Sequence, residues 1–242
     1  MRAEPAVPGS HIPYHARPRS AANRLARYLL GLVQLALYRH FFRVRVVGAH
    51  NVPSRGGLVI AANHASHLDM GLIKHALGPA GRELVSVAAK DYFFQAPLRR
   101  WYFTNFTNLL PFNRRASLHV SLRAAGRVLA DARNLLIFPE GTRTRDGRMG
   151  AFGPTLGFLA LKFSADVLPV YISGVFEAMP KGAWLPRRRA LGAAIGPLVS
   201  AAELRERTAG LPNTEAYRAA TIIIEEAVRK AGQAAFGIMQ PI

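Results

Sequence analysis

Short apolar runs recur along the chain and alternate with stretches of helical periodicity. The apolar runs predict strands over residues 43–48, 57–62, 83–89, 108–112, 134–138, 167–174 and 190–196. Helical patterns cover residues 67–77, 117–132, 155–164 and 214–231, the last with Asn213 as its expected cap. This alternation predicts an α/β fold, a single layered domain with a mostly parallel central sheet flanked by helices.

The beginning of the chain has a different composition from the rest. Residues 1–20 are rich in proline and lack the apolar core of a secretory signal, so we expect a flexible N-terminal arm there. Residues 21–242 show neither an internal repeat nor an interdomain linker, and we expect them to form one domain.

The segment 21–42 predicts an N-terminal amphipathic helix. Within "NRLARYLLGLVQLALYRHFF", the polar residues Arg24, Arg27, Gln34 and Tyr38 fall on one helical stripe, and leucines fill much of the remainder. Its uninterrupted apolar stretches are shorter than the roughly 18 residues of a membrane span. The pattern fits a helix lying in a membrane interface, with arginines at the headgroups, and also a helix packed on the domain.

Charge favours the membrane interface. The chain carries 32 lysine and arginine residues against 14 acidic ones, a net charge of +18. Such a surface attracts phosphate groups on nucleic acid or on anionic lipid. Because no recognition-helix, RNP or zinc-finger signature occurs, we expect an anionic bilayer surface as partner and no nucleic acid. The absence of cysteine excludes disulfides, thiolate metal sites and a cysteine nucleophile.

The stretch "AANHASHLDM" at residues 61–70 follows a predicted strand and combines two histidines with an aspartate. A metal site would use His64, His67 and Asp69, but the spacing H-x-x-H-x-D differs from known zinc patterns and no further cluster supplies ligands. We therefore expect no metal. A purely structural interpretation makes Asp69 a first-turn residue that favours the start of a helix.

A catalytic interpretation pairs His64 with Asp69. If the carboxylate accepts the Nδ1 proton, Nε2 is left to take a proton from a hydroxyl, and the substrate itself supplies the nucleophile. No G-x-S-x-G sequence occurs, which argues against a serine hydrolase.

A second polar loop follows the strand predicted at 134–138. In "FPEGTRTRDGRMGAF", Gly141 allows close backbone approach and Arg143 can bind a phosphate through two hydrogen bonds. A polar turn around residues 146–147 explains only the later part of this loop. Because loops at the carboxyl ends of parallel strands carry the chemistry of such sheets, the two loops and "PFNRR" are expected to converge on one site.

Four ordered blocks resemble those of the glycerolipid and lysophospholipid acyltransferases. "NHASHLD" resembles their N-H-x-x-x-x-D block, "FPEGTR" their F-P-E-G-T-R block, Arg114 in "PFNRR" the arginine of the intervening block, and "VLPVYISG" the V-P-V block. The resemblance covers roughly residues 43–200.

The resemblance implies transfer of a fatty acyl group from an acyl-thioester, on CoA or acyl carrier protein, to a hydroxyl of a lysophospholipid such as 1-acylglycerol-3-phosphate. His64 would be the general base and Asp69 its orienting partner, with no cofactor beyond the thioester co-substrate. It further implies a set of residues that hold the acceptor's phosphate: Arg114, Glu140, Gly141, Thr142 and Arg143.

Two departures from the family pattern keep alternatives open. Phe152 is followed by Gly153 where the family commonly has the F-K-x-G sequence, and Asn113 replaces an aspartate. A lyso-aminolipid or glycolipid could therefore replace lysophosphatidate as acceptor, and a non-catalytic, basic membrane-binding module is a further alternative. For the enzyme we expect a peripheral location on the inner, cytoplasmic face of the cytoplasmic membrane.

Overall fold

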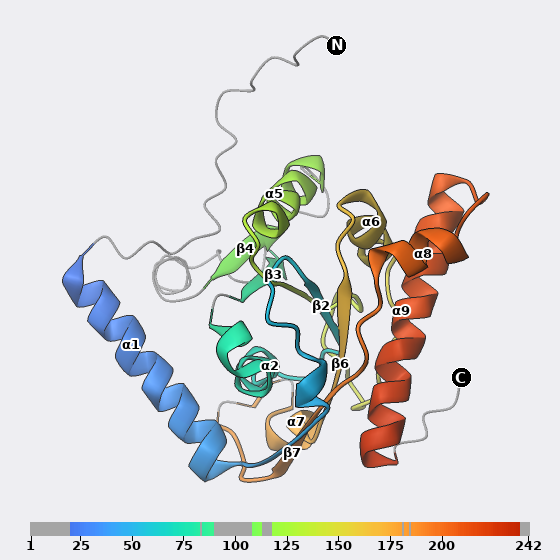
Figure 1. Ribbon diagram of the computed structural model, residues 1–242. Coiled ribbons are helices and arrows are strands. Elements are labelled where there is room, and N and C mark those ends of the chain that lie inside the picture. The colour runs from blue at the N-terminus through green and yellow to red at the C-terminus, as the bar shows by residue number, and fades with distance from the viewer. Residues whose placement is uncertain are drawn as a thin grey trace.

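The computed structural model describes residues 20–82, 84–89, 108–112, 118–180, 182–183 and 185–237. The predicted arm at residues 1–20 lies outside the described residues except for Ser20, whose side chain accepts a hydrogen bond from the backbone N–H of Asn23. Figure 1 shows a central sheet covered by helices on both faces.

The sheet contains seven strands in the described part of the chain. They are β1 (Arg43–Val47), β2 (Val59–Ala62), β3 (Val85–Ala89), β4 (Leu109–Phe112), β5 (Leu135–Ile137), β6 (Val167–Ser173) and β7 (Ala190–Ile195). Their order is β1-β7-β6-β2-β5-β3-β4, and every neighbouring pair of these strands is parallel except β6 and β7. The predicted mostly parallel sheet is confirmed, with each strand inside an apolar run that predicted it.

The helices agree less closely with the sequence patterns. They are α1 (Ala21–Ala36), α2 (Asp69–Leu77), α5 (Leu118–Ala130), α6 (Thr155–Lys162), α7 (Val175–Ala178), α8 (Ala201–Arg207) and α9 (Asn213–Phe236), with the π-helix η1 (Leu37–Phe41) and the 3₁₀ helices η2 (Ala49–Asn51) and η3 (Gly78–Gly81). The short helices α7 and α8 were not predicted, because a helix of four or seven residues is too short to show a helical period in the sequence. Asn213, expected as a cap, is instead the first residue of α9, and Pro212 precedes it.

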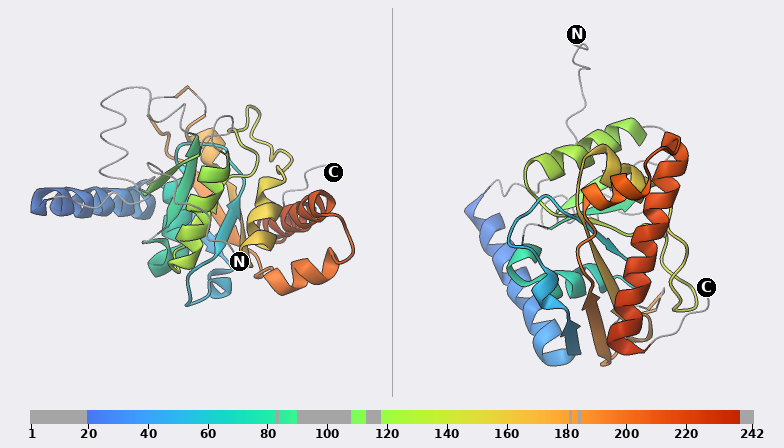
Figure 2. Two further views of the ribbon diagram at one scale, coloured as in Figure 1. Left: turned by 90° about the horizontal axis from the view of Figure 1, so that it is seen from above. Right: turned by 45° about the vertical axis from the view of Figure 1, so that its right-hand side comes forward.

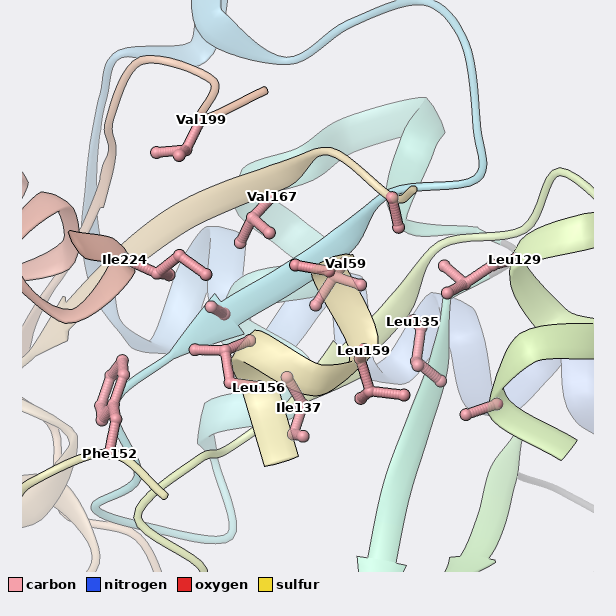
Figure 3. Packing of buried hydrophobic residues seen from close by; sticks show 14 of the residues in the cluster. Val59, Leu129, Leu135, Ile137, Phe152, Leu156, Leu159, Val167, Val199 and Ile224 are labelled. Atoms are coloured by element: carbon pink, nitrogen blue, oxygen red, sulfur yellow. The ribbon is translucent and has the colours of Figure 1, made fainter. Parts of the chain in front are cut away.

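Burial on both faces explains why the strands are apolar without interruption. Along β2, Val59 and Ala61 belong to one core cluster, whereas Ile60 and Ala62 belong to the other. Successive side chains of a strand point to opposite faces, so a strand covered on both sides alternates between two cores. The helices α5, α6, α8 and α9 pack on the first face, and α2, α7 and η1 pack on the second. Figure 3 shows the first core, to which β2 contributes Val59, α6 contributes Leu156 and α9 contributes Ile224.

The helix α1 stands apart from this packing. Figure 2 shows it extending away from the rest of the chain, joined to the sheet through η1 and β1. Its large apolar side chains are between 41% and 66% exposed: Leu25, Tyr28, Leu29, Leu30, Leu32, Val33 and Leu35. The rest of the domain therefore leaves these side chains uncovered. The membrane interface, the other placement that the sequence left open, stays a prediction. In the described part of the chain, no helix combines the length and apolarity needed to cross a membrane.

Candidate active site

The site begins where β2 ends. Asn63, the residue after β2, is buried and connects this strand end to β6. Its Nδ2 donates to the backbone oxygen of Ile172 at 3.0 Å, and its Oδ1 accepts the Ile172 backbone N–H at 2.8 Å. The amide side chain thereby continues the pairing of the two strands for one more residue and fixes the start of the turn that follows.

Asp69 organises that turn. Its side chain is completely buried, and its Oδ2 lies 2.7 Å from Nδ1 of His64. The same carboxylate accepts the backbone N–H of Ala65 at 2.6 Å and that of Ser66 at 2.9 Å. As the first residue of α2, it also places negative charge at the positive end of the helix. Asp69 therefore stabilises the start of α2 and contacts His64 at the same time, so its structural role does not exclude the catalytic one.

The hydrogen bond to Asp69 decides which ring nitrogen of His64 is basic. A carboxylate that accepts two backbone amides has only acceptor capacity to offer, so Nδ1 carries the proton and Nε2 holds the free lone pair. The His64 side chain is 24% exposed, and its ring stacks on Phe138 with centroids 4.1 Å apart. The imidazole is thus held at both its nitrogen edge and its face.

The loop after β5 holds the backbone of His64. Glu140 Oε1 accepts the His64 backbone N–H at 2.7 Å, and the backbone N–H of Thr144 donates to the His64 carbonyl at 2.9 Å. The other carboxylate oxygen, Oε2, accepts the Gly150 backbone N–H at 2.9 Å. Glu140 therefore joins the histidine turn to two parts of the loop between β5 and α6.

Burial raises the pKa of Glu140 to about 7. The hydrogen bonds from Gly150 and His64 favour the charged form and act in the opposite direction, whereas the nearby charge of Asp69 raises the pKa further. Arg229 on α9 also lowers it. The Glu140 carboxyl, which contacts the backbone of His64, therefore changes charge near neutral pH.

The other residues expected to hold a phosphate lie on the same loop, with one exception. Gly141 has a positive φ of 73°, which only a residue without a Cβ adopts easily, and turns the chain toward Thr142 and Arg143. Thr142 is exposed and Arg143 is half-buried. Arg114 lies outside the described residues.

Helix α9 holds the end of this loop through a hydrogen bond to Phe152. The sequence did not predict this contact. Glu225 Oε2 accepts the Phe152 backbone N–H at 2.8 Å, and its Oε1 accepts a hydrogen bond from Nη2 of Arg229 at 2.7 Å. The segment that departs from the family's F-K-x-G sequence is thus held by an ion pair on a distant helix.

The sequence did not predict two contacts around His64 and Asp69. Phe138 belongs to the "FPEGTR" block, but its stacking on His64 was not expected. The hydroxyl of Ser66 donates to the Met179 carbonyl at 2.7 Å, across 113 positions of sequence. An aromatic residue directly before "PEGTR" was the available signal for Phe138. Within the described residues, no group of three or more histidine or acidic side chains could hold a metal ion.

Several known proteins resemble this chain in sequence. A family model described as Acyltransferase matches residues 43–173. The chain is 29% identical to a 1-acyl-sn-glycerol-3-phosphate acyltransferase of Chlamydomonas reinhardtii, over 66% of this chain and 47% of that protein. It is 28% identical to the chloroplastic 1-acyl-sn-glycerol-3-phosphate acyltransferase LPAT1 of Arabidopsis thaliana, over 59% of this chain and 39% of that protein. The chain thus spans half or less of the length of these two relatives.

A solved structure shares the fold. The 1-acyl-sn-glycerophosphate (LPA) acyltransferase PlsC from Thermotoga maritima matches with a TM-score of 0.67, covering 93% of this chain and 86% of that chain. The sequence identity is 23%.

Proposed function

Because this chain belongs to the acyltransferase family, we propose that it moves a fatty acyl group from an acyl-thioester to a hydroxyl of a lysophospholipid. The thioester is carried by CoA or acyl carrier protein. The names of the similar proteins support 1-acylglycerol-3-phosphate as the acceptor. The observation that carries the proposal is the 2.7 Å contact between His64 Nδ1 and the buried carboxylate of Asp69.

In the proposed reaction His64 acts as general base. Its Nε2 takes the proton of the acceptor hydroxyl while the hydroxyl oxygen attacks the carbonyl carbon of the thioester. The tetrahedral intermediate then expels the thiolate, the C–S bond breaks, and the imidazolium returns the proton to the sulfur. Asp69 stabilises the imidazolium and keeps the ring in the reactive tautomer. Neither a covalent enzyme intermediate nor a metal enters this sequence of steps.

The loop after β5 binds the phosphate of the acceptor in this proposal. Arg143 offers paired N–H donors, Gly141 and Thr142 supply close backbone approach, and Arg114 adds a second cation. Glu140 is expected in the same set, and its hydrogen bonds give it a supporting role as well. Both of its carboxyl oxygens accept backbone N–H groups, so Glu140 holds the loop against the histidine turn.

We propose further that α1 rests in the surface of an anionic membrane. Its leucines are exposed to a degree that water disfavours, and a bilayer interface would cover them. Exposed arginines cluster where α1 joins the sheet, because β1 pairs in parallel with β7: Arg39, Arg43, Arg45, Arg187, Arg188 and Arg189. Phosphate headgroups would neutralise these cations. This placement fits a peripheral enzyme on the cytoplasmic face of the cytoplasmic membrane.

The activity is tested with purified protein, anionic vesicles, and either acyl-CoA or acyl-acyl carrier protein. Thiol release is measured with lysophosphatidate, with a lyso-aminolipid and with a glycolipid acceptor, and the products are identified by mass spectrometry. Thiol release that requires lysophosphatidate and yields phosphatidate supports the proposal. Release with only a non-phosphate acceptor changes the substrate class, and silence with every pair of donor and acceptor contradicts the enzyme and leaves a binding module.

Membrane binding is tested by sedimentation with vesicles. Leu29→Asp on α1 is expected to lower binding about tenfold or more, because it places a charge in the apolar interface. Leu211→Asp is the matched control, since Leu211 is also exposed but lies between α8 and α9. Equal losses for the two variants would contradict the role of α1, and salt should weaken binding of the wild type by screening its arginines.

A further inference from the structure

Tyr38 lies where the projecting N-terminal helix meets the domain. It belongs to the π-helix η1, which continues α1 directly. The leucines of α1 are exposed, but Tyr38 is only 2% exposed. The π-helix ends this helical segment just before β1, and the Tyr38 side chain turns from the exposed helix into the second core.

The hydroxyl of Tyr38 reaches the residue next to Asp69. It donates to the backbone carbonyl of Leu68 at 2.6 Å, across 30 positions of sequence. The same carbonyl accepts the backbone N–H of Leu72 at 3.0 Å, the first hydrogen bond of α2. Leu68 is the cap residue of that helix and has no side-chain hydrogen bond to offer. The phenol thus supplies an additional contact to the cap of α2.

This contact acts on the His64–Asp69 pair through one peptide bond. The carbonyl of Leu68 and the backbone nitrogen of Asp69 belong to the same rigid peptide unit. Fixing its plane fixes the position of the Asp69 Cα. The carboxylate that extends from this Cα holds Nδ1 of His64 at 2.7 Å. The path from η1 to the imidazole therefore consists of two short hydrogen bonds and one planar group.

The ring of Tyr38 has little freedom to move. It stacks on His75 with centroids 6.0 Å apart and contacts Phe42 at 5.6 Å. Gly71 leaves the space that the phenol occupies, because a Cβ there would lie 2.5 Å from the hydroxyl oxygen and 2.6 Å from ring atom Cε2. Burial, and secondarily the negative charge of Asp69, raise the pKa of Tyr38 well above its usual range, so the phenol keeps the proton that it donates.

We propose that Tyr38 is a positioning residue for the reaction: its hydroxyl holds the cap of α2, and thereby Asp69 and His64, in the geometry that proton transfer requires. The inference rests on the proposed function of the His64–Asp69 pair. It implies that the side chains of His64 and Asp69 are aligned partly by the helical segment of α1 and η1, and not only by the sheet.

The test uses the full chain with anionic vesicles, acyl-CoA and lysophosphatidate. Tyr38→Phe removes the hydroxyl and keeps the ring. We expect kcat to fall about 3- to 10-fold, as for loss of one hydrogen bond, with the KM values for both substrates within twofold of the wild type. Vesicle binding should stay unchanged, because the leucines of α1 are intact.

Gly71→Ala provides a second route to the same change. Its Cβ must displace the Tyr38 phenol, so kcat should fall again and the two substitutions together should cost less than the product of their separate effects. The control is Ser54→Ala, which removes an exposed hydroxyl between η2 and β2, away from α1 and the site. It should keep the wild-type kcat.

The outcomes separate this inference from the proposed function. A wild type that is inactive with every acceptor overturns the proposed function and this inference with it. An active wild type, with Tyr38→Phe at the wild-type kcat, overturns the positioning role and leaves the proposed function standing. A lowered melting temperature with unchanged kcat would show that Tyr38 only stabilises the fold, and would also overturn the proposal.

Discussion

Glu140 holds the backbone of His64: its Oε1 accepts the histidine's N–H at 2.7 Å, while Oε2 accepts the N–H of Gly150 at 2.9 Å. The side chain of His64 is aligned by Asp69, and its main chain is aligned by Glu140. Asp69 begins α2, which follows β2, and Glu140 lies in the loop after β5. The strands β2 and β5 are neighbours in the sheet. The imidazole and the backbone of His64 are therefore each held by an acidic side chain.

Replacing Glu140 by glutamine should disturb this alignment without changing the size of the side chain. The amide offers one acceptor oxygen, so the N–H of either His64 or Gly150 would face an NH₂ group. An unsatisfied buried N–H group costs about 1–3 kcal/mol. If this cost falls on the reactive arrangement of His64, kcat should drop by roughly 5- to 150-fold. Steady-state kinetics would check this. Glu177→Gln, on the exposed side of α7, is the control and should stay near wild type.

The raised pKa of Glu140 predicts a dependence of stability on pH. The folded protein holds the proton up to a pH of about 7, whereas the unfolded chain releases it near the ordinary 4.5. The folded state thus binds more protons between these values, so this group's contribution to the free energy of unfolding is fully present below pH 4.5 and is lost as the pH rises to about 7. Chemical denaturation at a series of pH values would measure it. A Glu140→Gln variant with the same pH dependence as the wild type would contradict the assignment.

Arg143 should affect binding of the acceptor more than the chemical step. If it holds the phosphate, Arg143→Ala should raise the KM for lysophosphatidate about 10- to 100-fold, since a hydrogen bond to a charged group is worth roughly 1.5–3 kcal/mol. The KM for an acceptor without a phosphate should change little. Arg145→Ala removes an exposed arginine two positions away and serves as control. Equal effects of the two variants would indicate a general loss of positive charge instead of a phosphate site.

Much of the fold was predictable because its strands are buried on both faces. An uninterrupted run such as "GLVIAA" is what a strand between two cores requires, and each predicted strand and the mostly parallel sheet are confirmed. The family resemblance is confirmed as well. The short helices α7 and α8 escaped prediction because four and seven residues show no period.

The site was predictable only where its residues are close in sequence. His64 and Asp69 are five positions apart, so their pairing followed from local geometry, and the structure brings them together at 2.7 Å. Glu140 was recognised as a site residue, but its bond to a main-chain amide 76 positions away depends on the neighbouring placement of β2 and β5. The bond from Tyr38 to Leu68 likewise depends on how α1 joins the domain, which no local pattern encodes.

The central claim is that His64 is the base, and thiol release by His64→Ala tests it most directly. The measurement uses acyl-CoA, lysophosphatidate and anionic vesicles, with His67→Ala as the matched control three positions away. Loss of a general base should lower acceptor-dependent kcat by about 10²- to 10⁴-fold, with the melting temperature and vesicle binding retained. His67→Ala should stay within a fewfold of the wild type. A His64→Ala variant that keeps the wild-type kcat would contradict the account.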